Sequence, residues 1–283
     1  MTQIYQAEKK ETGSLTKNNS RDQAIGIFDS GIGGLSIAQC ISISLPNEKF
    51  IYIADSLFAP YGDKSSSTII DRVNKLADWL IAQNVKAIVV ACNTATVIAI
   101  EQLRLRVSIP IIGVEPAIKP AAQKSITQKI ALLVTEATAV NHRFLALVSK
   151  HKNSTEVFIQ PCPGLVELIE RGLHESEQCR EILNDFILPL LKKDIDTLVL
   201  GCTHYPFVRS LIQEIVGDNI TIVETAQPVT EQLARQLEKK GLLAINSHIS
   251  PQAFFSSKIS QEQAGLMSTF FRQNISLQQF PII

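Results

Sequence analysis

Two cysteines of this chain stand in the same local pattern. Cys92 ends the apolar run of KAIVVACNTAT (86–96), and Cys202 ends that of DTLVLGCTHYP (196–206). A thiol beside a helix N-terminus and a polar partner can have a lowered pKa, so that the thiolate is available near neutral pH. Because the ordinary value is about 8.5, only a modest shift is needed. We therefore predict two reactive thiols that face each other across one small substrate.

Two further titratable residues accompany these thiols. Asp29 follows the apolar run AIGIF, and His204 lies two residues after Cys202. Both are placed to move protons or to set the charge beside the sulfurs, although a structural histidine, or one that only hydrogen-bonds substrate, explains His204 equally well. The other cysteines lack this setting and are interpreted as core or surface residues: Cys40, Cys162 and Cys179.

Racemisation is the reaction that uses two thiols best. Inverting a carbon requires a base on one face and an acid on the other, and the reverse direction exchanges their roles. Acyl transfer needs one thiol, one base and oxyanion donors, so it leaves the second cysteine unexplained. A zinc site at Cys202-x-His204 is the rival interpretation, with Cys92 and Asp29 as further ligands. No motif implies pyridoxal phosphate or a flavin, so we expect no cofactor and no metal.

The stretch FDSGIGGLS (28–36) first suggests a nucleotide-binding loop, with Asp55 as the acid that binds ribose. The fit is poor, because Ser36 stands where the third glycine belongs and Asp29 would face the pyrophosphate. Two interpretations stay open. The glycines allow a helix to begin close to a sheet, or the backbone amides of Ser30 to Gly34 surround a small carboxylate while Asp29 receives a substrate ammonium.

Buried strands and helices alternate along the chain and must position these residues. Apolar, β-branched runs predict strands at 24–31, 50–55, 86–92, 109–114, 154–162 and 219–225. The stretch 128–138 resembles the first strand with its loop, and 196–206 matches 86–96 in register. Helical spacing occurs at 35–44, 67–83, 94–106, 165–171, 178–191 and 229–240. Apolar runs without alternation indicate strands covered on both sides, hence parallel sheets with crossover helices.

The pattern of the first half recurs in the second, which predicts an internal repeat. We expect an α/β protein of two similar, doubly wound (Rossmann-like) parallel-sheet domains with pseudo-two-fold symmetry. The predicted boundaries are a flexible N-terminal arm at 1–23, a first domain at 24–116 completed by 226–283, and a second domain at 117–225. The tail at 247–283 has no clear pattern. Ligands of parallel sheets bind beyond the carboxyl ends of the strands, so the active site should lie between the domains.

Composition narrows the class of protein. The 283 residues are 45% hydrophobic and 19% charged, which is typical of a globular chain. Lys+Arg and Asp+Glu balance at 27 each, so no global field favours nucleic acid or an anionic membrane. No apolar run approaches the roughly 18 residues that cross a bilayer, and the N-terminus lacks a signal-peptide core. Five cysteines without a C-x-x-C pair favour reduced thiols, and hence a cytoplasmic protein.

Seven motifs, in order, resemble the glutamate racemases of the cofactor-independent aspartate/glutamate racemase family. They are IFDSGIGGLS, ADS, APYG, ACNTAT, GVEPA, CPGLVELIE and LGCTHYP, and the resemblance runs from about residue 24 to about residue 237. It implies two α/β domains and a two-base interconversion of L- and D-glutamate, the latter destined for peptidoglycan. It also implies that Cys92 acts on the D-enantiomer and Cys202 on the L-enantiomer, assisted by Asp29 and His204.

The resemblance further implies a set of substrate-binding residues. They are Asp29, Ser30, Tyr61, Gly62, Asn93, Thr94, Thr203 and His204, with Thr135 and Thr138 as weaker candidates for binding a carboxylate. One departure is Val134, where many members have glycine. The polar arm resembles extensions found in Gram-negative members, some of which need a UDP-muramoyl-alanine precursor as activator. We expect glutamate and this activator as partners, and a monomer or homodimer; racemisation of aspartate and non-catalytic ligand binding are the alternatives.

Overall fold

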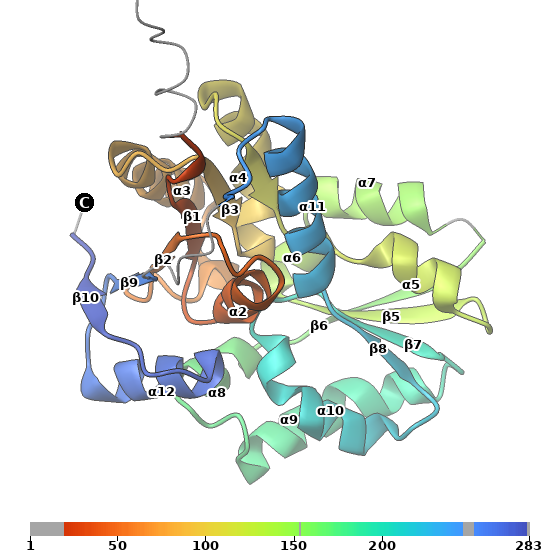
Figure 1. Cartoon of the computed structure of the whole chain (residues 1–283). Coiled ribbons are helices and arrows are strands. Elements are labelled where there is room, and N and C mark those ends of the chain that lie inside the picture. The colour runs from red at the N-terminus through yellow and green to blue at the C-terminus, as the bar shows by residue number, and fades with distance from the viewer. Residues whose placement is uncertain (1–19, 153, 246–251, 282–283) are drawn as a thin grey trace, which may run out of the picture.

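Two separate parallel sheets, each covered by helices on both faces, make up the fold (Figure 1). The computed structural model describes residues 20–152, 154–245 and 252–281. The first sheet has the strand order β10-β9-β2-β1-β3-β4 and the second the order β6-β5-β7-β8. Every strand pair is parallel within the described residues, as the runs without alternation predict.

The strand bounds follow the predicted runs closely. In the first sheet they are β1 (Ile25–Asp29), β2 (Phe50–Ala54), β3 (Ala87–Val90), β4 (Ile111–Gly113), β9 (Ala253–Ser256) and β10 (Leu277–Gln279). In the second sheet they are β5 (Lys129–Val134), β6 (Glu156–Pro161), β7 (Thr197–Leu200) and β8 (Thr221–Val223).

The internal repeat is confirmed by the strand order. Four adjacent strands of the first sheet run β2-β1-β3-β4 and end at the β4 edge, and the four strands of the second sheet run β6-β5-β7-β8. Strand β7 therefore holds the place in the second sheet that β3 holds in the first. Cys92 follows β3 and Cys202 follows β7, each two residues after the strand ends. The two cysteines thus occupy equivalent positions in two copies of one topology.

Helices cover both faces of each sheet. In β1, Ile25 and Ile27 face one side and Phe28 the other, as the two-residue period of a strand requires. The first sheet packs against α2 (Leu35–Ser44), α11 (Ala226–Lys239) and α12 (Gln261–Phe271) on one face, and against α3 (Ser66–Ala82) and α4 (Asn93–Arg106) on the other. The second sheet packs against α5 (Ile118–Lys124) and α7 (His142–His151), and against α8 (Leu165–Glu170), α9 (Glu177–Leu191) and α10 (Arg209–Val216).

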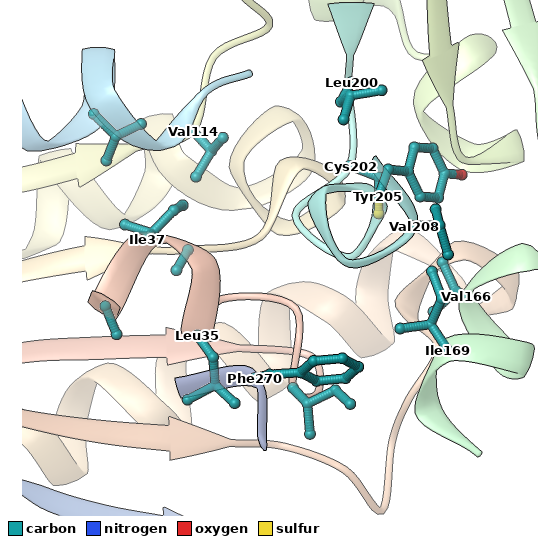
Figure 2. Packing of buried hydrophobic residues seen from close by; sticks show 14 of the residues in the cluster. Leu35, Ile37, Val114, Val166, Ile169, Leu200, Cys202, Tyr205, Val208 and Phe270 are labelled. Atoms are coloured by element: carbon teal, nitrogen blue, oxygen red, sulfur yellow. The ribbon is translucent and has the colours of Figure 1, made fainter. Parts of the chain in front are cut away.

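One hydrophobic cluster joins the two halves. Figure 2 shows part of it, in which Leu35 and Phe270 from the first half share the cluster with Ile169 and Tyr205 from the second. Cys202 lies in the same cluster (Figure 2). Because a shared apolar core opposes separation of the halves, it holds their strand ends together.

The remaining short elements lie at the strand ends. They are the 3₁₀ turns η1 (Tyr61–Asp63) and η2 (Tyr205–Val208) and the short helix α6 (Glu136–Ala139). The strand predicted within 128–138 ends at Val134, because Thr135 caps α6 by accepting the amide of Thr138. Sequence spacing also missed α5, α7 and α10.

The chain returns to the first sheet after the second. Helix α11 packs against α2, as expected, and β9 pairs with β2. Of the tail without a predicted structure, residues 247–251 and 282–283 lie outside the described residues. The rest supplies β9, α12 and β10 to the first sheet, although the boundaries at 116 and 226 stay predictions.

A buried ion pair fastens the start of the described chain. Arg21 donates through Nε to the carbonyl of Gly241 at 2.8 Å, and Lys86 Nζ donates to the carbonyls of Arg21 at 2.6 Å and Leu242 at 2.9 Å. Lys86 also pairs with Glu48 at 2.5 Å. These contacts hold the part of the predicted arm that the structure describes, residues 20–23, while residues 1–19 lie outside the described residues. Among the described helices, none has the length and hydropathy that crossing a bilayer requires.

Candidate active site

Cys92 is the N-cap residue of α4. The buried strand β3 delivers it to the start of the helix, where its sulfur accepts a hydrogen bond from the amide of Ala95 at 3.5 Å. Its thiol donates to the hydroxyl of Ser30, which follows β1, at 3.7 Å. The side chain is buried. A helix N-terminus carries partial positive charge, so this position suits a sulfur that becomes an anion during a reaction.

The pKa of Cys92 is not lowered in this site, contrary to the prediction. Burial raises the pKa of this thiol, and the negative charge of Asp29 raises it further, against the smaller effect of the Ala95 amide. The charge of Cys202 also raises it, so the two sulfurs are close enough to interact electrostatically. Burial and the charge of Asp29 therefore keep the proton on Cys92.

Cys202 is paired with His204. The two residues follow β7 in a turn, and the sulfur lies 3.7 Å from Nδ1 of the imidazole. On its other side, His204 Nε2 lies 2.6 Å from Oε1 of Glu170, at the end of α8. Glu170 Oε1 also accepts the amide of Ile32 from the first half, at 2.8 Å. The imidazole is thus fixed between a thiol and a carboxylate.

This arrangement favours the imidazolium form of His204. Burial lowers the pKa of the ring, but the hydrogen bonds to Cys202 and Glu170, with their charges, outweigh burial and raise the pKa well above its usual range. A positive imidazolium beside Cys202 stabilises a thiolate there, because opposite charges attract strongly in a buried site. Both ring nitrogens of His204 are thus occupied, one by the thiol of Cys202 and the other by the carboxylate of Glu170.

Asp29 is a fully buried carboxylate at the end of β1. Its Oδ2 accepts the amide of Gly34 at 2.8 Å, and the hydroxyl of Ser30 donates to Oδ1 at 3.4 Å. Burial raises the pKa of Asp29 to about 6, while the nearby positive charge of His204 opposes that rise. Asp29 can therefore exchange a proton close to neutral pH, as residues at catalytic sites often do.

The glycines after Asp29 allow side chains of the second half to approach. A Cβ on Gly31 would lie 1.8 Å from Glu170 Oε1, and one on Gly33 would lie 2.4 Å from Nδ1 of His204. Neither interpretation of the glycine-rich stretch foresaw this contact. The proposal of a carboxylate cradle is wrong at Ile32 and Gly34, because their amides already donate to Glu170 and Asp29.

Three threonine hydroxyls connect the halves at the other side of Cys92. Thr94 Oγ1 lies 3.0 Å from Thr135 Oγ1, which donates to Thr138 Oγ1 at 2.9 Å. We call these three residues the threonine cluster. Gly62 of η1 lies against it, since a Cβ there would be 3.6 Å from Cβ of Thr135. Hydroxyls and backbone amides at strand ends suit a carboxylate ligand.

The remaining predicted residues also gather here. Asn93 donates to the carbonyl of Val114 at 3.5 Å, and its Oδ1 is buried without a hydrogen-bond partner within the described residues. Thr203 is buried, and its carbonyl accepts the hydroxyl of Ser36 at 3.2 Å. Tyr61 is buried beside Gly62 in η1, and its hydroxyl donates to Oδ2 of Asp55 at 2.7 Å.

Glu170 is the site residue that the sequence interpretation missed. It lies in CPGLVELIE, a quoted motif from which no role was assigned. A groove of about 800 Å³ opens beside it, lined among others by Pro60, Glu170, Lys258 and Leu266.

In the part of the chain that the structure describes, no group of three or more His, Cys, Asp or Glu side chains gathers as metal ligands would.

Comparison with known proteins agrees with this geometry. Residues 36–246 match the family described as Asp/Glu/Hydantoin racemase. A glutamate racemase of Pseudomonas aeruginosa is 41% identical over 245 residues, which is 86% of this chain and 92% of that protein. The solved structure of a glutamate racemase isoform from Bacillus anthracis superposes with a TM-score of 0.84 at 32% identity, over 93% of this chain and 98% of that one.

A third relative was solved with its ligands. The glutamate racemase of Escherichia coli, in complex with L-glutamate and the activator UDP-MurNAc-Ala, has a TM-score of 0.81 at 28% identity, over 92% of this chain and 99% of that one. The family match, the sequence identities and the coverage of these relatives agree on the family of this chain. The chain belongs to the Asp/Glu/Hydantoin racemase family, and its relatives there include glutamate racemases.

Proposed function

We propose that this protein interconverts L- and D-glutamate without a cofactor, using Cys92 and Cys202 as the two proton carriers. The observation that carries the proposal is the equivalence of the two thiols: each stands two residues beyond the corresponding strand, β3 or β7, of two sheets in which four adjacent strands have the same order. A pseudo-symmetric pair supplies one thiol to each face of the α-carbon, as inversion requires. The names of the relatives support glutamate as the substrate.

The proton transfers follow from the site. With L-glutamate bound, the Cys202 thiolate removes the α-proton, and the electron pair of the C–H bond remains on the α-carbon. The Cys92 thiol then delivers its proton to the opposite face, which yields D-glutamate, a Cys202 thiol and a Cys92 thiolate. In the reverse direction the two cysteines exchange roles. This assignment of enantiomers is the one that the family resemblance implies.

The charged neighbours fit these roles. His204 as imidazolium stabilises the thiolate of Cys202, since its pKa is raised and its ring lies 3.7 Å from the sulfur. On the other side, Asp29 raises the pKa of Cys92, and a substrate ammonium beside Asp29 would offset that negative charge. Substrate binding would therefore lower the pKa of Cys92 at the moment when its thiolate is needed.

The same proposal covers the substrate contacts. Ser30 and Asp29 face the Cys92 side, Thr203 and His204 face the Cys202 side, and the threonine cluster with Gly62 lies beyond Cys92. We assign the threonine cluster and Gly62 to a substrate carboxylate.

Regulation and cellular role are part of the proposal. The Escherichia coli relative was solved with UDP-MurNAc-Ala as its activator, which supports the same nucleotide precursor as an activator of this chain and D-glutamate supply to peptidoglycan as its role. All five cysteines are free, as a reducing compartment such as the cytoplasm maintains them.

One experiment tests the central claim. The protein is incubated with L-glutamate in deuterated water, with and without UDP-MurNAc-Ala, and optical rotation and α-carbon deuterium are followed together. Racemisation predicts decay of rotation to zero with one deuterium gained per inversion. Faster turnover of aspartate than of glutamate would point to the alternative substrate, and absence of inversion under both conditions would remove the proposal.

A further inference from the structure

We propose that Asp55 and Arg72 are positioning residues whose buried ion pair holds Tyr61, and with it the turn 58–62, against the threonine cluster. The inference rests on the proposed function, because it assigns this turn to the binding of the substrate's distal carboxylate. In the sequence, Asp55 was considered only as the ribose acid of a nucleotide loop that fits poorly, and the active-site chemistry leaves it without a role.

The ion pair is buried and geometrically complete. Arg72 donates through Nε to Oδ2 of Asp55 at 2.9 Å and through Nη2 to Oδ1 at 2.8 Å, which is the parallel fork that guanidinium and carboxylate form best. Tyr61 donates its hydroxyl to the same Oδ2 at 2.7 Å. The exposed fractions are 0% for Asp55, 3% for Arg72 and 2% for Tyr61. A charge pair this deeply buried is costly to desolvate, so net stability alone is a poor reason for it.

One carboxylate thereby connects three elements around the site. Asp55 directly follows β2, and its amide donates to the carbonyl of Asp29 at 3.0 Å, at the end of β1. Arg72 comes from α3, and its guanidinium lies 4.0 Å from the ring centroid of Phe58 in the turn. Tyr61 belongs to η1, and Gly62, the next residue of the same turn, lies against the threonine cluster. The ion pair therefore fixes the position of the turn 58–62 relative to β1, the strand that carries Asp29.

This geometry decides what the turn offers to a ligand. Because the Tyr61 hydroxyl is committed to Asp55, the part of η1 nearest Thr135 is the backbone of Gly62. A glycine has no side chain with which to fix its own amide, so its neighbours must place it. We assign that task to Asp55 and Arg72, acting through Tyr61. Weakening the ion pair should therefore loosen substrate binding without altering the proton carriers.

Steady-state kinetics with two variants and a matched control test this. Tyr61→Phe removes only the hydroxyl, and Asp55→Asn removes the charge. Each variant should raise KM at least five-fold for L- and D-glutamate alike, while kcat stays within two-fold of wild type. The reason is that a contact far from the reacting carbon stabilises the bound substrate and the transition state equally. Glu48→Gln breaks a second buried ion pair that lies outside the site, to Lys86 at the amino end of the first sheet. It should lower the melting temperature and leave KM unchanged.

The outcomes separate the two proposals. A wild-type protein that fails to racemise glutamate overturns the proposed function, and the positioning role falls with it. A wild type that racemises glutamate, together with Tyr61→Phe of unchanged KM, overturns the positioning role alone. So does a KM increase of equal size in Glu48→Gln, or a fall in kcat at constant KM. Tyr61→Phe decides the question if Asp55→Asn does not fold.

Discussion

The imidazole of His204 lies 2.6 Å from the carboxylate of Glu170, although one residue follows β7 and the other ends α8. The same carboxylate oxygen accepts the amide of Ile32 from the first half of the molecule. Glu170 therefore sets the ring orientation of His204 and fastens the glycine-rich turn to the second sheet. The charge beside the thiol of Cys202 and the contact between the two halves therefore depend on the same carboxylate.

The first prediction concerns Glu170→Gln. Loss of the charge should lower the pKa of His204 and weaken the support for a Cys202 thiolate, so kcat should fall by about 10- to 100-fold, less than removal of a general acid or base costs. Steady-state kinetics and the NMR titration of the imidazole measure both effects. Glu167→Gln, one turn earlier on the exposed side of α8, is the control. Equal losses in the two variants would contradict the role of Glu170.

The second prediction separates the thiols. Cys92→Ser and Cys202→Ser should each lower kcat by about 10²-fold or more, because a serine hydroxyl is a much poorer proton carrier than a thiol. Cys40→Ser should stay within about two-fold of wild type, since Cys40 is only half-buried on α2 and bonds to Gln227. The racemisation rates of the three variants, measured from L- and from D-glutamate, test this prediction. Comparable losses in the Cys40 and Cys92 variants would remove Cys92 from the reaction.

The third prediction uses the raised pKa of Asp29. If Asp29 receives the substrate ammonium, only its ionised form binds productively, so kcat/KM should increase with pH through a limb centred near pH 6. The raised pKa of the Cys92 thiol lies far from this limb and leaves it separate. A pH profile of kcat/KM measured between pH 4.5 and 8 checks it. A profile that is flat through this window would argue against an ionised Asp29 in the free enzyme.

The fourth prediction follows from the same pKa through linkage. A carboxyl whose pKa is raised from 3.8 to about 6 on folding binds its proton more tightly in the folded state. Its contribution is therefore complete below about pH 3.8 and is lost as the pH rises through about 6, a loss of about 3 kcal/mol. Urea unfolding of wild type and Asp29→Asn at pH 4 and pH 7 isolates it. The wild type should lose stability relative to the variant; the opposite sign would refute the raised pKa.

The fifth prediction tests the close approach at the glycine turn. Gly33→Ala places a methyl group 2.4 Å from Nδ1 of His204, so the ring must move and activity should fall at least about ten-fold. Gly265→Ala, in α12, meets nothing within 4 Å and should stabilise its helix by up to about 1 kcal/mol. Activity and melting temperature of both variants report the difference. An active Gly33→Ala variant would show that the ring is not held there.

Much of the fold was predictable because local patterns determine it. Apolar runs without alternation indicated buried parallel strands, and the repetition of KAIVVAC and DTLVLGC indicated two copies of one topology. Helices α5, α7 and α10, of seven, ten and eight residues, were not predicted, although α8, which has only six residues, was. The tail was missed because its strands, β9 of four residues and β10 of three, are too short to show a clear periodicity.

The sequence by itself determined which residues reach the strand ends: a strand length and a following turn place Cys92, Cys202, Asp29 and His204 there whatever lies opposite. Only the tertiary structure decided what those residues meet. Glu170 reaches His204, and Asp55 binds Arg72, across long separations in the chain, so neither contact has a local signal. The direction of the Cys92 pKa shift was likewise wrong from the sequence, because burial and the charge of Asp29 arise only once the chain is folded.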